Sequence, residues 1–84
     1  MDQTVNIRKA LRVFHSILDK GERHGNEYHL NGLRAESDFD GYTASLRNDY
    51  VSLDIFFHNK FAFHYSNSKE KDRFLEKIDA MDKT

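Results

Sequence analysis

Residues 53–66 read LDIFFHNKFAFHYS, a run of fourteen residues that contains four Phe, one Tyr and two His. On either side of its centre, every second side chain is apolar, which is the period of a β-strand. The residues expected on one face are Leu53, Ile55 and Phe57 before the centre and Phe61, Phe63 and Tyr65 after it. The run therefore predicts two antiparallel strands whose aromatic side chains line the inner face of a sheet.

The loops on both sides of Leu53 set the expected strand registers. A three-residue loop at 58–60 places Phe57 opposite Phe61, and a two-residue turn at 48–49 places Leu46 opposite Val51. Both loops keep the apolar sets on one side of the sheet. A slip of one residue would turn half of the core toward water, so we expect these registers.

Two amphipathic helices are expected to flank the sheet. The N-terminal stripe is built from Ile7, Leu11, Phe14 and Leu18, widened by Ala10 and Ile17. Thr4 or Asn6 can cap its start, and we expect Gly21 in the left-handed conformation at its end. The C-terminal helix has the capping-box pair Asn67 and Glu70. Its apolar stripe consists of Phe74, Leu75, Ile78 and Met81.

The segment GERHGNEYHLNG, residues 21–32, is interpreted as a linker that runs into the first strand. Asn31-Gly32 is a turn or bulge signal and leaves two alternatives. Residues 28–35 form either one strand broken at Gly32 or two very short strands in a tight hairpin. We favour the single irregular strand, because its halves are short.

These elements predict one α+β domain over residues 1–84. Its N-terminal and C-terminal helices pack on one face of a three- to four-stranded antiparallel meander, in the order α-β-β-β-(β)-α. The expected core consists of Leu11, Phe14, Leu18, Leu46, Val51, Leu53, Ile55, Phe57, Phe61, Phe63, Phe74 and Ile78.

The composition narrows the classes of function. Thirteen basic and fourteen acidic residues give a net charge of −1, a poor electrostatic footprint for nucleic acid or an anionic membrane. No segment has the roughly 18 consecutive apolar residues of a membrane span. The chain has no cysteine and its charged N-terminal stretch is unlike a signal peptide, so we expect a cytoplasmic protein.

The face of the sheet opposite the core supplies the candidate site. The expected registers place Asp54 between Thr43 and His64, and Phe56 opposite Ala62. The candidate interaction face consists of Tyr50, Phe56, Arg47, Asp54 and His64. Phe56 and Tyr50 form an exposed aromatic patch on it, and edge strands add unpaired backbone groups, so the leading hypothesis is a non-catalytic module that binds protein, itself included.

Two alternatives use the same face. Single-stranded nucleic acid would need exposed rings among basic residues, for which Arg47, Tyr50, Phe56 and His64 are the candidates. An Asp54–His64 pair could carry out acid–base chemistry, although its simpler interpretation is a surface ion pair.

His24 and His29 flank a glycine-containing loop and could meet in space, but no histidine spacing matches a standard zinc signature. We expect no enzyme activity, cofactor or metal.

Three segments carry a resemblance to a known family: ALRVFHSILDKG from Ala10, DFDGYTASL from Asp38 and LDIFFHNKFAFHY from Leu53. They resemble a family of short bacterial proteins of unknown function, over roughly residues 10–75. The resemblance implies a small cytoplasmic bacterial protein and assigns no activity, cofactor or catalytic residue.

Overall fold

The computed structural model describes residues 6–37, 43–56 and 60–83. The elements in chain order are α1 (Ile7–Lys20), β1 (Glu22–His24), β2 (Glu27–Leu30), β3 (Leu33–Ser37), β4 (Ala44–Arg47), β5 (Val51–Phe56), β6 (Lys60–Tyr65) and α2 (Ser68–Asp82). Three predictions concern residues outside these ranges: the Thr4 cap, the position of Phe57 and the loop at 58–59.

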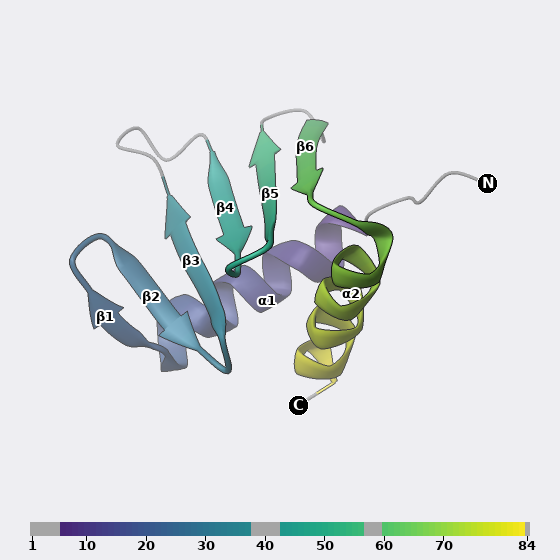
Figure 1. Cartoon of the computed structure of the whole chain (residues 1–84). Coiled ribbons are helices and arrows are strands. Elements are labelled where there is room, and N and C mark those ends of the chain that lie inside the picture. Colours follow the sequence, from purple (N-terminus) through teal and green to yellow (C-terminus); the bar gives the residue numbers. More distant parts are fainter. Residues whose placement is uncertain (1–5, 38–42, 57–59, 84) are drawn as a thin grey trace.

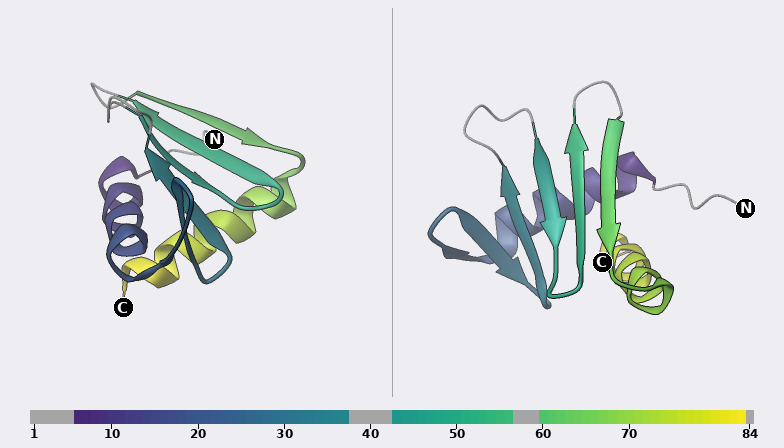
Figure 2. Two further views of the ribbon diagram at one scale, coloured as in Figure 1. Left: turned by 90° about the vertical axis from the view of Figure 1, so that its left-hand side faces the viewer. Right: turned by 45° about the horizontal axis from the view of Figure 1, so that its top comes forward.

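The strands form one antiparallel sheet in the order β1-β2-β3-β4-β5-β6, with both helices on the same face (Figure 1). α1 runs across β2, β3 and β4, whereas α2 packs on α1 and touches β5 and β6 (Figure 2). The predicted α+β architecture is therefore confirmed. The predicted number of strands, three to four, is wrong, because the described residues contain six.

The additional strands come from the segment interpreted as a linker. β1 and β2 form a hairpin there, and β3 continues the meander after a tight turn at Asn31-Gly32. Asn31 has φ of 54° and Gly32 has φ of 83°, and two successive positive φ values suit a two-residue hairpin turn. The favoured single irregular strand is thus wrong and the hairpin alternative is correct. β2 can be short because it pairs on both sides.

The core lies between the sheet and the two helices. Its buried apolar residues are Ala10, Val13, Phe14, Ile17, Leu33, Ala35, Leu46, Val51, Leu53, Ile55, Phe74, Ile78 and Met81. Leu11 and Leu18, which were predicted as core residues, pack only at its margin. The most deeply buried residues of α1 include Val13 and Ile17 instead. Phe61 is a correction to the predicted core, since its side chain is 38% exposed.

Both predicted registers are shifted by two residues. Leu46 pairs with Leu53, and Ile55 pairs with Phe61. At the β4–β5 turn the Asn48 N–H donates a 2.9 Å hydrogen bond to the Val51 carbonyl, so the turn encloses Asp49 and Tyr50 and lies one residue beyond the predicted 48–49. The Asn48 side chain supports this turn by accepting hydrogen bonds from the backbone N–H groups of Tyr50 and Val51, both 2.8 Å long. A shift of two leaves every side chain on its predicted face.

Side-chain caps begin both helices. Asn6 Oδ1 accepts a hydrogen bond from the Lys9 N–H at 3.0 Å, and Asn67 Oδ1 accepts one from the Glu70 N–H at 2.9 Å. The prediction for Gly21 is wrong, because this residue is extended, with φ of −78° and ψ of 168°.

Ion pairs join α1 to α2 at the surface. Arg12 binds both carboxylate oxygens of Asp82, at 2.7 and 2.9 Å, and Lys9 Nζ lies 2.6 Å from Asp79 Oδ1. The hydrogen bond from Arg12 lowers the pKa of Asp82, and that from Lys9 lowers the pKa of Asp79. The first half of α1 and the end of α2 are thereby linked by charge as well as by the core.

These pairs predict a pH dependence of stability. A carboxyl pKa that folding lowers stabilises the fold above the unfolded pKa, about 3.9 for Asp, and this contribution is lost as the pH falls through the folded value. Wild type should therefore melt at a higher temperature than Asp82→Asn at pH 6, and the difference should shrink as the pH drops below about 4. A difference in melting temperature that stays constant down to pH 2.5 would show that the Asp82 charge is not involved.

Candidate interaction surfaces

The sheet face opposite the helices is polar, and we call it the open face. Strand pairing aligns its side chains in two rows that cross the sheet. The first row is Glu22, His29, Arg34, Arg47, Ser52 and His64, and the second is His24, Glu27, Glu36, Ser45, Asp54 and Ala62. Basic groups predominate in the first row and acidic groups in the second.

Most charges of these rows are compensated within the chain. Arg47 Nη2 lies 2.7 Å from Glu36 Oε1, which joins one row to the other. His29 Nε2 lies 3.2 Å from Glu27 Oε1, and this hydrogen bond lowers the pKa of Glu27. The open face therefore carries several ion pairs within the chain, and a partner that binds there would have to compete with them.

The predicted Asp54–His64 pair is absent. Asp54 pairs with Ser45 on one side and Ala62 on the other, and Ser45 Oγ donates a 2.7 Å hydrogen bond to its carboxylate. His64 lies opposite Ser52 in the other row. The register shift of two residues separates the groups, so the acid–base hypothesis loses the geometry on which it depended.

The remaining candidate residues divide between two places. Arg47, Tyr50 and His64 line one shallow groove of about 410 Å³ at the β4–β5 turn, where Tyr50 is 58% exposed. Phe56 lies at the opposite end of β5, opposite Lys60, and is 41% exposed. The exposure of both aromatic side chains agrees with the prediction. Their grouping into one patch does not, because the length of β5 separates them.

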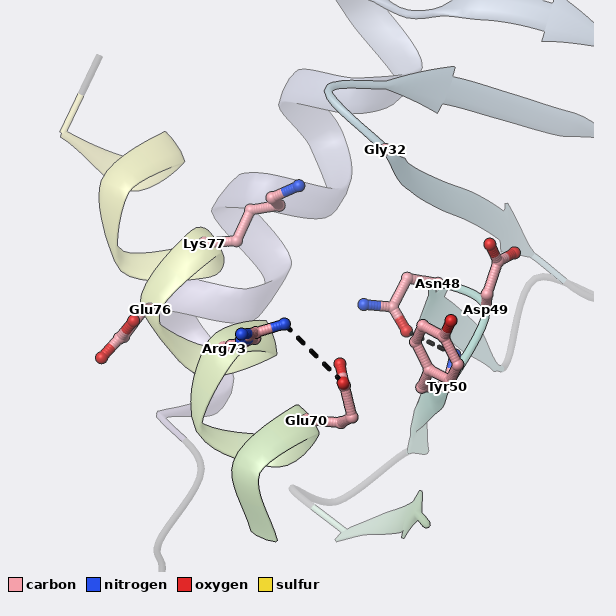
Figure 3. Close-up of a pocket in the computed structure, with 8 residues that line it drawn as sticks. All are labelled: Gly32, Asn48, Asp49, Tyr50, Glu70, Arg73, Glu76 and Lys77. Carbon is pink, nitrogen blue, oxygen red and sulfur yellow. Dashed lines mark hydrogen bonds and ion pairs between the residues drawn. The ribbon is translucent and has the colours of Figure 1, made fainter. Parts of the chain in front are cut away.

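A second groove, of about 560 Å³, separates α2 from the β2–β3 and β4–β5 turns (Figure 3). Its lining residues are Gly32, Asn48, Asp49, Tyr50, Glu70, Arg73, Glu76 and Lys77. Lys77 Nζ donates a 2.8 Å hydrogen bond to the Asn31 carbonyl, and Arg73 lies 3.8 Å from Glu70. The third charged contact of the lining, from Asp49, goes to Arg34, which does not line the groove. Charges of both signs thus line this groove without converging on one point where a ligand could bind.

The histidines of the β1–β2 hairpin meet in space. The rings of His24 and His29 stack with centroids 4.4 Å apart, and each Nε2 faces a glutamate of its own strand. Two stacked rings cannot direct their nitrogens at one ion. Within the part of the chain that the structure describes, no group of three or more His, Cys, Asp or Glu could hold a metal.

Strand β6 presents an exposed aromatic surface that the sequence interpretation assigned to the core. Phe61 and Tyr65 lie on its helix-facing side and are 38% and 46% exposed. Phe63, between them, contacts Tyr65 and the α2 residue Phe74, with ring centroids 5.4 and 6.0 Å apart. Lys71 Nζ lies 5.1 Å from the Tyr65 ring centroid. We call Phe61, Phe63 and Tyr65, with the outer backbone of β6, the β6 edge.

Among the described residues, no strand pairs with the outer backbone of β6. β6 is the last strand of the sheet and pairs with β5 along its six residues on one side. The period-two pattern placed its aromatic side chains on the correct face but did not show how far the helices cover it. α1 lies under β2–β4, and α2 reaches β6 at its Tyr65 end (Figure 2).

Comparison with models of protein families shows the family of the chain. The model of a family described as "Protein of unknown function (DUF3081)" matches residues 5–84. The chain belongs to this family. The membership confirms the resemblance to a family of unknown function. Neither the curated proteins nor the solved structures contain a significant match. Among the described residues, no helix is long and apolar enough to cross a membrane.

Proposed function

We propose that this chain is a small non-catalytic interaction module that binds a protein segment by strand addition along β6. The observation that carries the proposal is the coincidence of an outer strand with two exposed aromatic side chains, Phe61 and Tyr65, next to it. An outer strand presents a row of N–H and C=O groups that a further strand can pair with.

The β6 edge lacks several devices that usually protect such a strand. Proteins keep edge strands from pairing by making them very short, by placing Pro in them or by covering them. β6 has six residues, KFAFHY, without proline. Lys60 and His64 are its basic side chains, and they point to the open face rather than to the aromatic side.

The energetics favour the β6 edge over the open face. Binding at Phe61 and Tyr65 would remove exposed aromatic surface from water. Each Å² of apolar surface buried contributes roughly 25 cal/mol of favourable free energy. Binding over Arg47 and Glu36 would first desolvate an ion pair that is already made, and such burial yields little net gain. A cytoplasmic location and a bacterial source belong to this proposal, the first because the chain has no cysteine and the second from the family resemblance.

Protein capture with matched variants tests the proposal. Tagged wild type, Phe61→Ser and Phe56→Ser are used as baits in a lysate of the source organism. Untagged copies of the chain are present, so that binding of the chain to itself is also detected. Bound proteins are identified by mass spectrometry. Phe56 is the control because it is a phenylalanine of similar exposure on the opposite face. We expect specific proteins to be retained by wild type and Phe56→Ser and to be lost with Phe61→Ser.

Two results would contradict strand addition at β6. Loss of binding with Phe56→Ser but not with Phe61→Ser would move the site to the open face. Retention by all three baits would show that neither ring contributes. Circular dichroism spectra should be alike for the three baits, since both rings are partly exposed in the folded chain.

A further inference from the structure

We infer that the protein segment added at β6 is the β6 strand of a second copy of this chain, antiparallel to the first about a two-fold axis through Phe63. This inference rests on the proposed function and names its partner. The result would be one continuous sheet across two copies, with all four helices on the same side. The inference follows from the self-complementarity of residues 60–66.

The aromatic side chains are the first part of that complementarity. In this register Phe63 lies opposite the partner copy's Phe63, and Phe61 lies opposite the partner copy's Tyr65. All these side chains lie on the helix-facing side of β6. Directly opposed aromatic pairs are among the favourable cross-strand pairs. Each of the two exposed rings, 38% and 46% exposed in one copy, thus gains an aromatic neighbour.

Charge selects this register over the two neighbouring ones that keep the same faces, which have their axes at Ala62 and His64. An axis through Phe63 places Lys60 opposite Ser66 and Ala62 opposite His64 of the second copy. An axis through Ala62 would instead place Lys60 opposite His64 twice, and two groups that can both be positive repel each other across a strand pair. An axis through His64 would place the two copies' His64 side chains directly opposite each other. The Phe63 axis avoids both contacts.

The position of the helices also suits a second copy. α2 starts next to the Tyr65 end of β6 and leads away from the Lys60 end (Figures 1 and 2). Its contacts with the β6 rings are made to Phe63 and Tyr65. An antiparallel pair brings the partner copy's Tyr65 end, with its α2, beside Phe61. The two α2 helices then lie at opposite ends of the new strand pair, and each helps to cover the end that the other leaves exposed.

Disulfide trapping gives a direct test, because the native chain has no cysteine. Ala62→Cys and His64→Cys are each purified, mixed under mild oxidation and compared with each variant alone. In the Phe63 register positions 62 and 64 of the two copies are directly opposite, at a Cα separation of about 4.5–5.5 Å that a disulfide can span. Identical positions are diagonal and about 7–8 Å apart, at or beyond that limit. We expect the mixed disulfide to predominate.

Sedimentation from micromolar to millimolar concentration tests the association itself. Wild type should convert from monomer to dimer, Phe61→Ser should raise the dissociation constant by at least about tenfold, and Phe56→Ser should change it by less than about twofold. Adding Phe61→Ser to both cysteine variants should reduce the yield of the mixed disulfide in the same proportion.

The outcomes separate this inference from the proposed function. A wild-type chain that stays monomeric, with no mixed disulfide, would overturn the inference, whereas the capture experiment would still show whether another protein binds at Phe61. A disulfide formed as readily by Ala62→Cys alone would overturn the Phe63 axis. A dimer that Phe61→Ser leaves intact would place the interface elsewhere.

Discussion

Phe74→Ala is expected to lower the free energy of unfolding by about 3–5 kcal/mol, the usual cost of removing a buried phenylalanine ring. Phe74 is 1% exposed, on the face of α2 that meets the core, and its ring lies 6.0 Å from that of Phe63. Truncation would leave a cavity where α2 joins the sheet. A chain of 84 residues has a total stability on the order of 5–10 kcal/mol, so a large part of the stability would be lost. Urea denaturation followed by circular dichroism measures the change.

Phe56→Ala is the matched control for this loss. Phe56 is 41% exposed on the open face, so its truncation should cost about 1 kcal/mol or less. If the two substitutions destabilised the chain equally, Phe56 would have to be covered in solution. That result would contradict the assignment of the open face as the uncovered side of the sheet.

The alternation of apolar residues was enough to predict the faces of β4, β5 and β6. Leu53 and Ile55 are buried as the pattern required, whereas Asp54 between them points to the open face. The same alternation could not determine the registers. A shift of two residues preserves every face, and the choice at the β4–β5 turn depends on hydrogen bonds from backbone N–H groups to the Asn48 side chain.

β1 was missed, and β2 and β3 were predicted as a single strand, for a different reason. β1 reads ERH and is exposed throughout, and β2 reads EYHL and is only partly buried. β1 contains no apolar residue, and the alternation in β2 is limited to Tyr28 and Leu30, which is too short to identify a separate half-buried strand. The signal that could have separated β2 from β3 was Asn31-Gly32, a strong hairpin turn, provided that a strand on each side of it was accepted as short.

The candidate face was predicted in part. Arg47, Tyr50 and His64 do come together in one groove, whereas Asp54 bonds to Ser45 and Phe56 lies at the far end of β5. The exposed Phe61 and Tyr65 could not be recognised from the sequence. Whether an inward-facing ring is buried depends on where a helix ends in space, and the residues of β6 do not encode that.

Gly21→Ala should be the most destabilising of the single-methyl changes considered for this chain, at about 2–3 kcal/mol. Gly21 joins α1 to β1, and its N–H donates a 2.7 Å hydrogen bond to the Ile17 carbonyl. An added Cβ would lie 2.5 Å from the Ile17 oxygen and 2.8 Å from the His29 oxygen. Both are backbone atoms, so a change of rotamer cannot relieve the contact, and α1 would have to move away from β2. Thermal and urea denaturation measure the effect.

Gly25→Ala separates this steric effect from backbone strain. Gly25 has φ of 65°, which costs an alanine about 1 kcal/mol, but a Cβ there would have no other atom within 4 Å. Gly21, at φ of −78°, has the opposite combination of a permitted conformation and no space. A larger loss at Gly21 than at Gly25 would show that the close approach of α1 to β2 requires the glycine. A smaller loss would mean that the end of α1 can shift at little cost, and that the β1–β2 hairpin is not held against the helix at this point.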